Sequence, residues 1–208
     1  MGRLRTSGIT TVLLVVLLMV GIMTAASMLD EGSTGTYTEE DYDQMVQEII
    51  DEITTMIDIK DQKCRFYDND GALKVEKIAL LLSPKVSQEI DFSSLSIQLD
   101  NGEFVEFLSF SGNSENLDGN TLFEHCIWDQ INESSFGFIS INDFDDSLVD
   151  FNCFNENSDN AYLVFKLSEP MKMKKHQRLT VTLFPSTGLV KRLTLQAPLP
   201  TTLVKDFD

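Results

Sequence analysis

The sequence predicts an α+β protein in which a long N-terminal helix, first apolar and then amphipathic, is followed by an all-β sandwich domain of immunoglobulin-like type. Three observations predict this fold class. Residues Ile9 to Leu29 carry no charge and are numerous enough for a membrane-length helix. Apolar residues then recur every three or four positions from Tyr42 to Ile57. From Lys63 the period changes to two, and β-branched and aromatic residues become frequent.

The apolar segment follows a short basic leader, Met1 to Gly8, which contains Arg3 and Arg5. At about 1.5 Å per residue, a helix over Ile9 to Leu29 is about as long as the hydrocarbon core of a bilayer is thick. Exposing its large apolar side chains to water would cost on the order of 20 to 40 kcal/mol, which exceeds the stability of a domain. The segment must therefore lie in lipid, pack against other helices, or be removed.

Two cleavage positions fit the sequence. The small residues Thr24 to Ala26 resemble a secretory cleavage site, which would start the mature chain near Ser27. The apolar run is longer than a usual secretory signal, and this weighs against that position. A cut between Gly8 and Ile9 would leave the apolar segment as the mature N-terminus, and this is the position that we predict.

A second, amphipathic part of the helix follows a predicted kink at residues 30–37, where two glycines and small polar residues loosen the helix. Thr38 and Asp41 resemble a capping box that begins the amphipathic part, which we expect to end near Ile59, so that the N-terminal helix spans residues 9–60. The apolar residues predicted to form the core of a helix bundle are Val12, Leu13, Val16, Leu17, Val20, Met45, Ile49 and Ile53.

The β-domain is predicted to span residues 63–208. Asp70-Gly71 and Asn101-Gly102 are two-residue hairpin signals, and Pro185 to Gly188 is a further turn. Short strands with turns between them favour a β-sandwich. The predicted strands are Lys63 to Tyr67, Ala72 to Leu82, Leu95 to Asp100, Phe104 to Phe110, Phe136 to Asn142, Ala161 to Leu167, Gln177 to Phe184 and Leu189 to Ala197.

The composition excludes several classes of function. The chain carries 33 acidic and 16 basic residues, a net charge of −17 at pH 7. A nucleic-acid partner is not expected, because such binding needs a basic stripe. His125 and His176 are the only histidines and lie in no nucleophile or zinc motif. We therefore expect no catalytic residue, no cofactor and no metal ligand.

Three further features leave alternatives open. Cys64, Cys126 and Cys153 have no CxxC spacing, so the sequence allows either one bridge with a spare thiol or three free cysteines. Asp68 to Gly71 resembles part of a calcium loop without its downstream Glu, and a hairpin turn is favoured. The acidic run Asn142 to Asn160 is interpreted as a solvated loop in preference to a calcium site.

The order of these motifs resembles that of archaeal flagellins (archaellins) with a class III, type IV pilin-like signal peptide. The resemblance rests on the leader ending at Gly8 before a retained apolar helix, on Lys74 to Glu103, KVEKIALLLSPKVSQEIDFSSLSIQLDNGE, and on Arg178 to Leu203, RLTVTLFPSTGLVKRLTLQAPLPTTL. It implies a structural subunit of the archaellum filament that serves swimming motility and polymerises through its N-terminal helix. Archaellins carry N-glycans, so the resemblance also makes Asn132 of the sequon Asn132-Glu133-Ser134 a glycosylation candidate.

The resemblance further implies the partners and the location of the chain. A precursor in the cytoplasmic membrane would be cut between Gly8 and Ile9 by a prepilin-type peptidase, and export machinery would build identical or related subunits into an extracellular helical filament. Two alternatives stay open. The chain could be a type IV-like adhesion pilin, or an uncleaved, membrane-anchored β-domain that serves the same machine as a stator or surface-layer-binding accessory.

Overall fold

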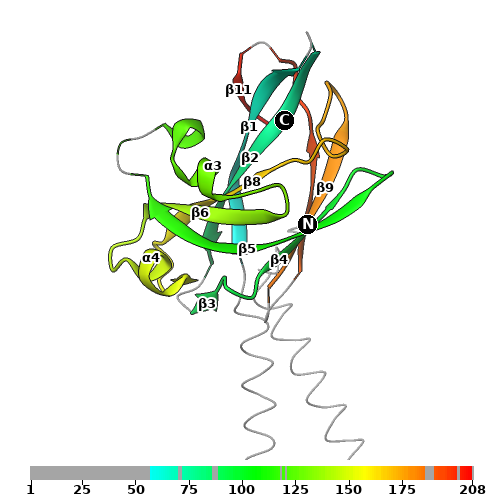
Figure 1. Cartoon of the computed structure of the whole chain (residues 1–208). Coiled ribbons are helices and arrows are strands. Elements are labelled where there is room, and N and C mark those ends of the chain that lie inside the picture. The colour runs from blue at the N-terminus through cyan, green and yellow to red at the C-terminus, as the bar shows by residue number, and fades with distance from the viewer. Residues whose placement is uncertain are drawn as a thin grey trace, which may run out of the picture. The chain divides into compact units, whose positions relative to one another are not determined.

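The computed structural model describes residues 57–69, 72–85, 89–117, 119, 121–185, 190–200 and 202–207, all within the compact unit Val46–Asp208. The predicted leader 1–8, the kink at 30–37 and the helix up to residue 56 lie outside the described residues. The described part is mostly β-structure with a few short helical turns (Figure 1).

The elements follow one another in a regular order along the chain. The strands are β1 (Ile57–Asn69), β2 (Ala72–Pro84), β3 (Ile90–Asp91), β4 (Ser96–Asp100), β5 (Val105–Asn116), β6 (Ser135–Asn142), β7 (Cys153–Phe154), β8 (Asn160–Lys166), β9 (Arg178–Phe184), β10 (Lys191–Gln196) and β11 (Val204–Asp206). The helical elements are the 3-10 turn η1 (Leu122–Glu124), α3 (Ile127–Gln130) and α4 (Ser147–Phe151).

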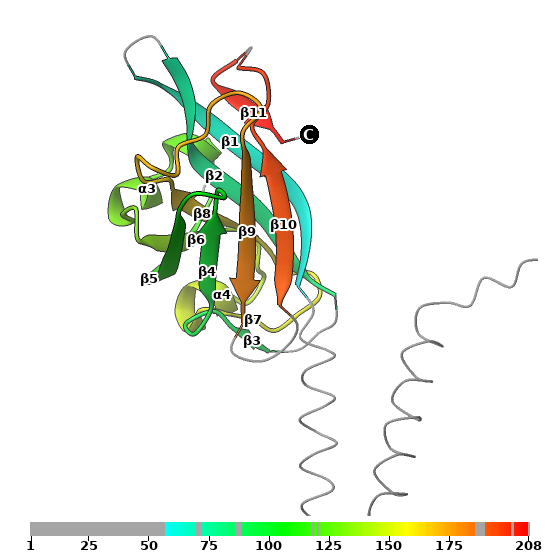
Figure 2. The ribbon, with the colours of Figure 1, turned by 90° about the vertical axis from the view of Figure 1, so that its right-hand side faces the viewer.

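Nine of these strands form a single sheet in the order β10-β9-β4-β5-β6-β8-β2-β1-β11, and β3 pairs with β7 in a small second sheet. The large sheet bends over itself, so that β4, β9 and β10 lie in front of β6, β8 and β2 (Figure 2). Two layers therefore face each other as in a sandwich. An immunoglobulin-like sandwich, as predicted, has two separate sheets, whereas here the two layers belong to one sheet that is joined through β5.

Strand β5 turns the corner between the two layers. Its first half, Val105–Ser109, pairs antiparallel with β4, whereas Ser109–Asn116 pairs in parallel with β6. The parallel ladder is irregular between Phe110 and Ser114, and Gly112 within that interval has φ +80°. Glycine suits this position because a side chain strains the left-handed backbone region.

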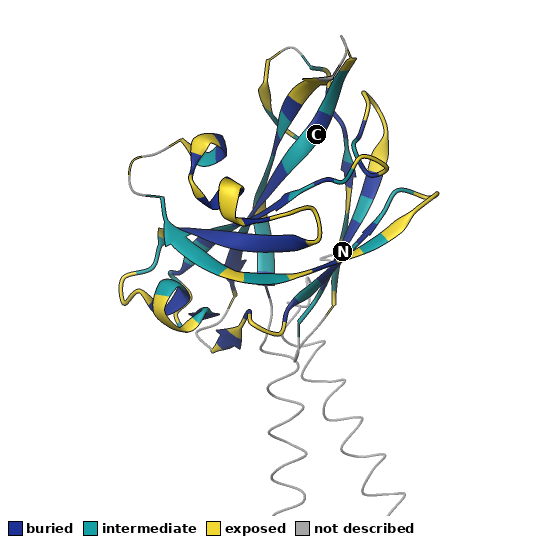
Figure 3. Cartoon of the chain, viewed as in Figure 1, coloured by how far each residue is buried: buried dark blue, intermediate teal, exposed yellow. Residues whose placement is uncertain are grey.

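The main core lies between the layers and is rich in phenylalanine. Phe92, Phe138 and Phe154 are fully buried, and the ring of Phe92 lies 4.5 Å from that of Phe138 and 4.7 Å from that of Phe154. Strand β6 is buried along most of its length, and Figure 3 shows it in the colour of buried residues. These contacts make β6 the central strand of the core.

A smaller core lies on the outer face of β2, β6 and β8, where η1 and α3 cover it with Phe123, Ile127 and Trp128. The approach is close at Gly137 of β6. A Cβ at this position would lie 3.0 Å from the Asn113 carbonyl oxygen and 3.0 Å from Ile127 Cδ1. Because that oxygen belongs to the backbone, only glycine lets β5 and α3 pack this closely on β6.

The β-domain begins earlier than predicted. Strand β1 starts at Ile57, so the prediction that the helix continues through Lys60 is wrong for residues 57–60. Ile57 lies four residues after Ile53, as in a helix, and two residues before Ile59, as in a strand. In the structure Ile57 is part of a strand because it pairs with Pro84 of β2. The following hairpin is confirmed, because Asn69 pairs with Ala72 across a two-residue loop.

The turn at Asn101-Gly102 differs from the two-residue hairpin that its sequence indicates. Asp100 pairs with Val105, which leaves a four-residue loop, and Gly102 has φ +89°. Asn101 Oδ1 accepts hydrogen bonds from the backbone N–H groups of Glu103 and Phe104 at 3.0 and 2.8 Å. These side-chain hydrogen bonds stabilise the longer loop in place of the backbone hydrogen bond that closes a tight two-residue hairpin.

All eight predicted strands are confirmed, with ends shifted by up to six residues, the largest shifts being at the start of β1 and at the end of β5. Strands β3, β7 and β11 and the helical elements were not predicted, because their two to five residues are too few to show a period.

The early start of β1 leads to a prediction for truncated chains. Residues 57–62 pair with Leu80–Pro84 of β2, and Ile57 is buried. We therefore expect fragment 57–208 to melt cooperatively, and fragment 63–208 to lose several kcal/mol and aggregate because part of β2 loses its partner. Thermal melting followed by circular dichroism, with sedimentation of both fragments, measures this. Equal stability of the two fragments would show that the first half of β1 is dispensable.

Candidate assembly surface

The residues predicted to form the cleavage site and the helical core lie outside the described residues. They are Gly8, Ile9, Val12, Leu13, Val16, Leu17, Val20, Met45, Ile49 and Ile53. Among the helices of the described ranges, none is long and apolar enough to cross a membrane. The described β-domain contains one predicted site residue, Asn132, and several exposed surfaces.

Asn132 lies on an exposed turn between α3 and β6. Its Oδ1 accepts hydrogen bonds from the Ser134 backbone N–H at 2.9 Å and from the Ser134 hydroxyl at 2.8 Å. The sequon thus forms a compact turn that holds the serine hydroxyl against the asparagine side chain. Asn132 lies in a shallow hollow that Phe107, 64% exposed, also lines. An enzyme that modifies Asn132 can reach it from solvent.

The acidic run 142–160 folds around α4 and presents two aromatic rings to solvent. Leu148 is fully buried, and Asp143 fixes the start of the helix by accepting the backbone N–H groups of Ser147 at 3.1 Å and Leu148 at 2.9 Å. Phe144 and Phe151 are 82% and 72% exposed. Because buried Leu148 and the hydrogen bonds of Asp143 fix the loop to the domain, the two rings are held in solvent at defined positions.

Most of the carboxylates of this loop accept hydrogen bonds from backbone N–H groups or from side chains. Asp159 is buried and accepts the backbone N–H groups of Asn155 and Glu156 at 3.0 and 2.9 Å. Burial raises the pKa of Asp143, whereas the hydrogen bond from Asn155 lowers the pKa of Asp145. The loop is therefore an acidic, aromatic projection stabilised by its own hydrogen bonds. We refer to residues 143–151 as the acidic knob.

An apolar pocket of about 480 Å³ lies between β1, η1, β8 and β11. Leu203 and Val204 at its edge are 57% and 45% exposed. Two cations, Lys63 and Arg65, also line it. The complete lining, called the β11 pocket below, consists of Lys63, Arg65, Leu117, Thr121, Leu122, Phe123, Glu124, Tyr162, Leu203 and Val204.

Arg65 of the pocket lining is also the first of three cations that form a row across the sheet. Arg65 of β1 pairs in register with Lys77 of β2, which pairs with Lys166 of β8. Like charges in opposite register positions are unfavourable. Burial lowers the pKa of Lys77, and the charges of Arg65 and Lys166 lower it further.

Each cation of the row is held by the segment that contains η1 and α3. Arg65 Nη1 donates to the Phe123 carbonyl at 2.8 Å, and Lys166 Nζ donates to the Ile131 carbonyl at 3.1 Å. Lys77 Nζ lies 4.8 Å from the ring centroid of Trp128. These contacts satisfy helix-end carbonyls and a π face, and they fix the wall of the β11 pocket.

On the same strand as Arg65, Lys63 lies 2.9 Å from Asp61 and 2.7 Å from Asp206 of β11. The hydrogen bonds that Lys63 donates to the carboxylates of Asp206 and Asp61 raise the pKa of Lys63. Burial acts to raise the pKa of Asp61, but hydrogen bonds from Lys63, the Gln62 N–H and Tyr162 together hold it below its ordinary value. This network attaches the short strand β11 to β1.

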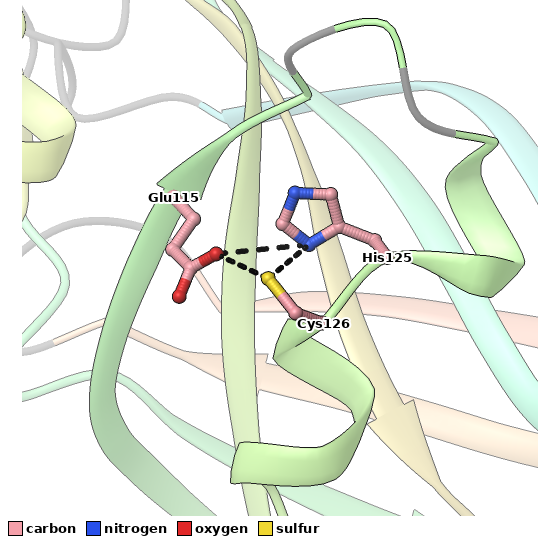
Figure 4. A group of neighbouring side chains, drawn as sticks. All are labelled: Glu115, His125 and Cys126. Carbon is pink, nitrogen blue, oxygen red and sulfur yellow. Dashed lines mark hydrogen bonds and ion pairs between the residues drawn. The ribbon is translucent and has the colours of Figure 1, made fainter.

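A cluster of Glu115, His125 and Cys126 joins the end of β5 to the start of α3 (Figure 4). Cys126 Sγ lies 2.8 Å from Glu115 Oε2, and His125 Nδ1 lies 4.0 Å from the same oxygen. The hydrogen bond to Glu115 raises the pKa of the Cys126 thiol, whereas the N–H groups of Cys126 and Ile127 act in the opposite direction. The prediction that no residue is placed to bind a metal did not anticipate this grouping.

The three cysteines are free thiols. Cys64 and Cys153 are buried, and burial raises their pKa values to about 12 and about 11, whereas Cys126 is exposed. Of the two alternatives that the sequence left open, the structure has the one without a bridge. Buried thiols of this kind are small apolar core residues and react slowly.

Comparison with known proteins gives matches of structure alone. No protein-family model matches the sequence, and no curated protein matches it. The crystal structure of archaeal flagellin FlaB1 from Methanocaldococcus jannaschii matches with a TM-score of 0.63 and 18% identity, over 73% of this chain and 95% of that chain. The archaeal flagellum of Methanospirillum hungatei strain JF1 matches with a TM-score of 0.50 and 11% identity, over 93% of this chain and 94% of that chain. Neither description names an enzyme.

The tie between Lys63, Asp61 and Asp206 gives a prediction for the pH dependence of stability. The pKa of Asp61 in the folded chain lies below its ordinary value of 3.8, so its contribution is present above about that pH and is lost as the pH falls through the folded value. We expect Asp61→Asn to lower the unfolding free energy of fragment 57–208 by up to about 1 kcal/mol at pH 7, and to have little effect near pH 2.

Urea unfolding at both pH values measures this difference. The matched control is Asp58→Asn, because Asp58 lies on the same strand and its ion pair with Lys191 is long, at 3.8 Å. An equal loss at pH 7 in both variants would contradict the proposed network.

The likeness to these two structures confirms the predicted β-rich fold, and the described β-domain of this chain has the archaeal flagellin fold.

Proposed function

We propose that this chain is a structural subunit of an archaeal flagellar filament, the archaellum, and that it serves swimming motility. The observation that carries the proposal is the archaellin fold of the β-domain, matched with a TM-score of 0.63 over 95% of the flagellin chain. The sequence attaches to that domain an uncharged segment, Ile9 to Leu29, behind a basic leader. In such a chain the β-domain can face solvent, while the apolar segment packs with the same segment of other subunits to form a shared apolar core.

In this proposal a prepilin-type peptidase cuts between Gly8 and Ile9 while the precursor is held in the cytoplasmic membrane. The apolar helices then move from lipid into a bundle that forms the centre of the extracellular filament. Because lipid is as apolar as the bundle, burial of apolar surface gains little, and side-chain packing together with the export machinery must drive the transfer. The same contact repeated head to tail without closing gives an open helical filament.

The surfaces of the β-domain support a second contact between neighbouring subunits. The acidic knob presents Phe144 and Phe151 to solvent, and the β11 pocket has an apolar lining of about 480 Å³. The knob carries carboxylates, whereas Lys63 and Arg65 line the pocket, and Arg65 makes no ion pair within the described residues. The apolar lining therefore suits the exposed rings of the knob, and Arg65 offers one cation to the carboxylates of the knob.

The positions of these surfaces suit a contact that propagates. Helix α4 lies near the lower end of the domain and β11 near the upper end in both views (Figures 1 and 2). Because the knob and the pocket lie at opposite ends of the domain, they cannot contact each other within one subunit. We therefore propose that the knob of one subunit enters the β11 pocket of the next.

We also propose that Asn132 carries an N-glycan in the native filament. The exposed turn and the Ser134 hydroxyl held against Asn132 support this assignment. Mass spectrometry of the peptide that contains Asn132, isolated from the native cell, is expected to show a glycan. An unmodified peptide would remove the assignment.

The filament proposal is tested by placing a charge in the apolar segment. Leu17→Asp should abolish filaments and swimming, because a carboxylate without a partner inside an apolar bundle costs several kcal/mol in every subunit. Leu17→Met is the control and should assemble. Electron microscopy and swimming assays of cells that express each variant give the result. Normal filaments with Leu17→Asp would contradict assembly through this helix, and wild-type filaments without motility would favour an adhesion pilin.

The contact between β-domains is tested by cross-linking. In a Cys126→Ser background, Phe144→Cys together with Leu203→Cys should form disulfides between subunits on oxidation and give a ladder of covalent oligomers. Phe144→Cys together with Val190→Cys is the matched control, because Val190 has a similar exposure of 55% and lies outside the pocket. Equal ladders from both pairs, or none from the first, would contradict the proposed contact.

A further inference from the structure

The inference concerns the Glu115, His125 and Cys126 cluster, which the proposed filament function does not use. These residues come from two separate elements, since Glu115 lies near the end of β5 and the other two directly precede α3. Each offers one ligand atom, and within the described residues they form the one such group of three. Figure 4 shows Glu115 Oε2, His125 Nδ1 and Cys126 Sγ pointing toward one another.

The protonation of His125 follows from its partners. Its Nε2 lies 3.0 Å from the Asn116 carbonyl oxygen, which can only accept a hydrogen bond, so Nε2 carries the proton. The other nitrogen, Nδ1, then has the electron pair, which accepts the Ile127 N–H at 3.2 Å, and it lies 3.9 Å from Cys126 Sγ. A histidine that ligates a metal commonly donates its second ring N–H to a backbone carbonyl in this way.

The surroundings also orient Glu115 and His125. Gln130 Nε2 donates to Glu115 Oε1, which leaves Oε2 facing the histidine and the thiol. His125 is buried, with 3% of its surface exposed, so its ring is fixed by packing. Cys126 is exposed, which leaves a route from solvent to the cluster.

The distances are compatible with a tetrahedral ion of the zinc class. With metal–ligand bonds of about 2.0 to 2.3 Å, ligand atoms in such a site lie about 3.4 to 3.6 Å apart. The three distances here are 2.8, 3.9 and 4.0 Å, so shifts of less than about 1 Å close the geometry. Glu115 can supply most of that shift, because a third of its side chain is exposed.

One existing contact has to change. The Ile127 backbone N–H donates to His125 Nδ1 at 3.2 Å, and a metal at Nδ1 would displace this bond. The thiol proton leaves to solvent when the metal binds.

We propose that Glu115, His125 and Cys126 form a binding site for a divalent transition-metal ion of the zinc class, which ties α3 to β5. The ligands are Oε2, Nδ1 and Sγ, and the fourth position faces solvent. The donor set of nitrogen, sulfur and one carboxylate oxygen favours zinc or cobalt over calcium or magnesium, which prefer oxygen alone. Since β5 joins the two layers of the sheet, such an ion would stabilise the junction between the small outer core and the corner of the sheet.

The test uses Co²⁺ added to the purified full-length chain as a spectroscopic probe. We expect thiolate-to-cobalt charge-transfer absorption in the near ultraviolet, and its loss in Cys126→Ser, which keeps both buried cysteines. Glu115→Gln should weaken Co²⁺ binding at least about tenfold, since even residues behind the ligands contribute that much. Glu124→Gln is the matched control, because Glu124 is exposed and lies on the same segment outside the cluster.

Both ligand variants change exposed or half-exposed side chains, and circular dichroism of the metal-free proteins checks that they fold. Absence of the charge-transfer band in the wild-type protein would overturn the proposal. A band that persists in Cys126→Ser, or an affinity that Glu115→Gln leaves unchanged, would overturn it as well. The result does not depend on filament assembly, because the titration reads the metal directly.

Discussion

The arrangement of the β-domain depends on the corner that β5 makes between the two layers of a single sheet. Its first half pairs with β4 in one layer and its second half pairs with β6 in the other, and the positive φ of Gly112 permits the change. Without this corner, the phenylalanines of β6 would have no facing layer to bury them. The corner also sets the end of β5 beside α3, which brings Glu115 to His125 and Cys126.

The parts of the fold that the sequence predicts are those that local patterns determine. Period-two alternation located all eight long strands, and the Asp70-Gly71 signal located the β1–β2 hairpin. The single sheet and the parallel pairing of β5 with β6 could not be predicted, because both depend on contacts between distant residues. The start of β1 was misplaced because Ile57 fits a helical and an extended period equally well.

The surfaces were less predictable than the fold, because the pairing register between strands determines which side chains lie next to one another. Arg65, Lys77 and Lys166 stand on three strands with no pattern linking them, and only the pairing of β1, β2 and β8 makes them a row. The adjacency of His125 and Cys126 is visible in the sequence, but the third member, Glu115, is brought in by the β5 corner. The exposed phenylalanines of the acidic run were the one available signal, since apolar residues in a solvated loop need a reason to be there.

The negative charge of the β-domain limits how neighbouring subunits of the proposed filament can pack. Residues 57–208 contain 24 acidic and 14 basic residues, a net charge of −10, so β-domains placed side by side repel one another, and at physiological salt this repulsion is screened beyond about 8 Å. Surfaces in direct contact lie within that distance and need local complementarity. In the β11 pocket Arg65 can supply it, because it lies at an apolar surface and makes no ion pair within the described residues, whereas Lys63 is already paired with Asp61 and Asp206. A heterologous contact of opposite charges can therefore offset the repulsion at the interface and leave the remaining surface acidic and solvated.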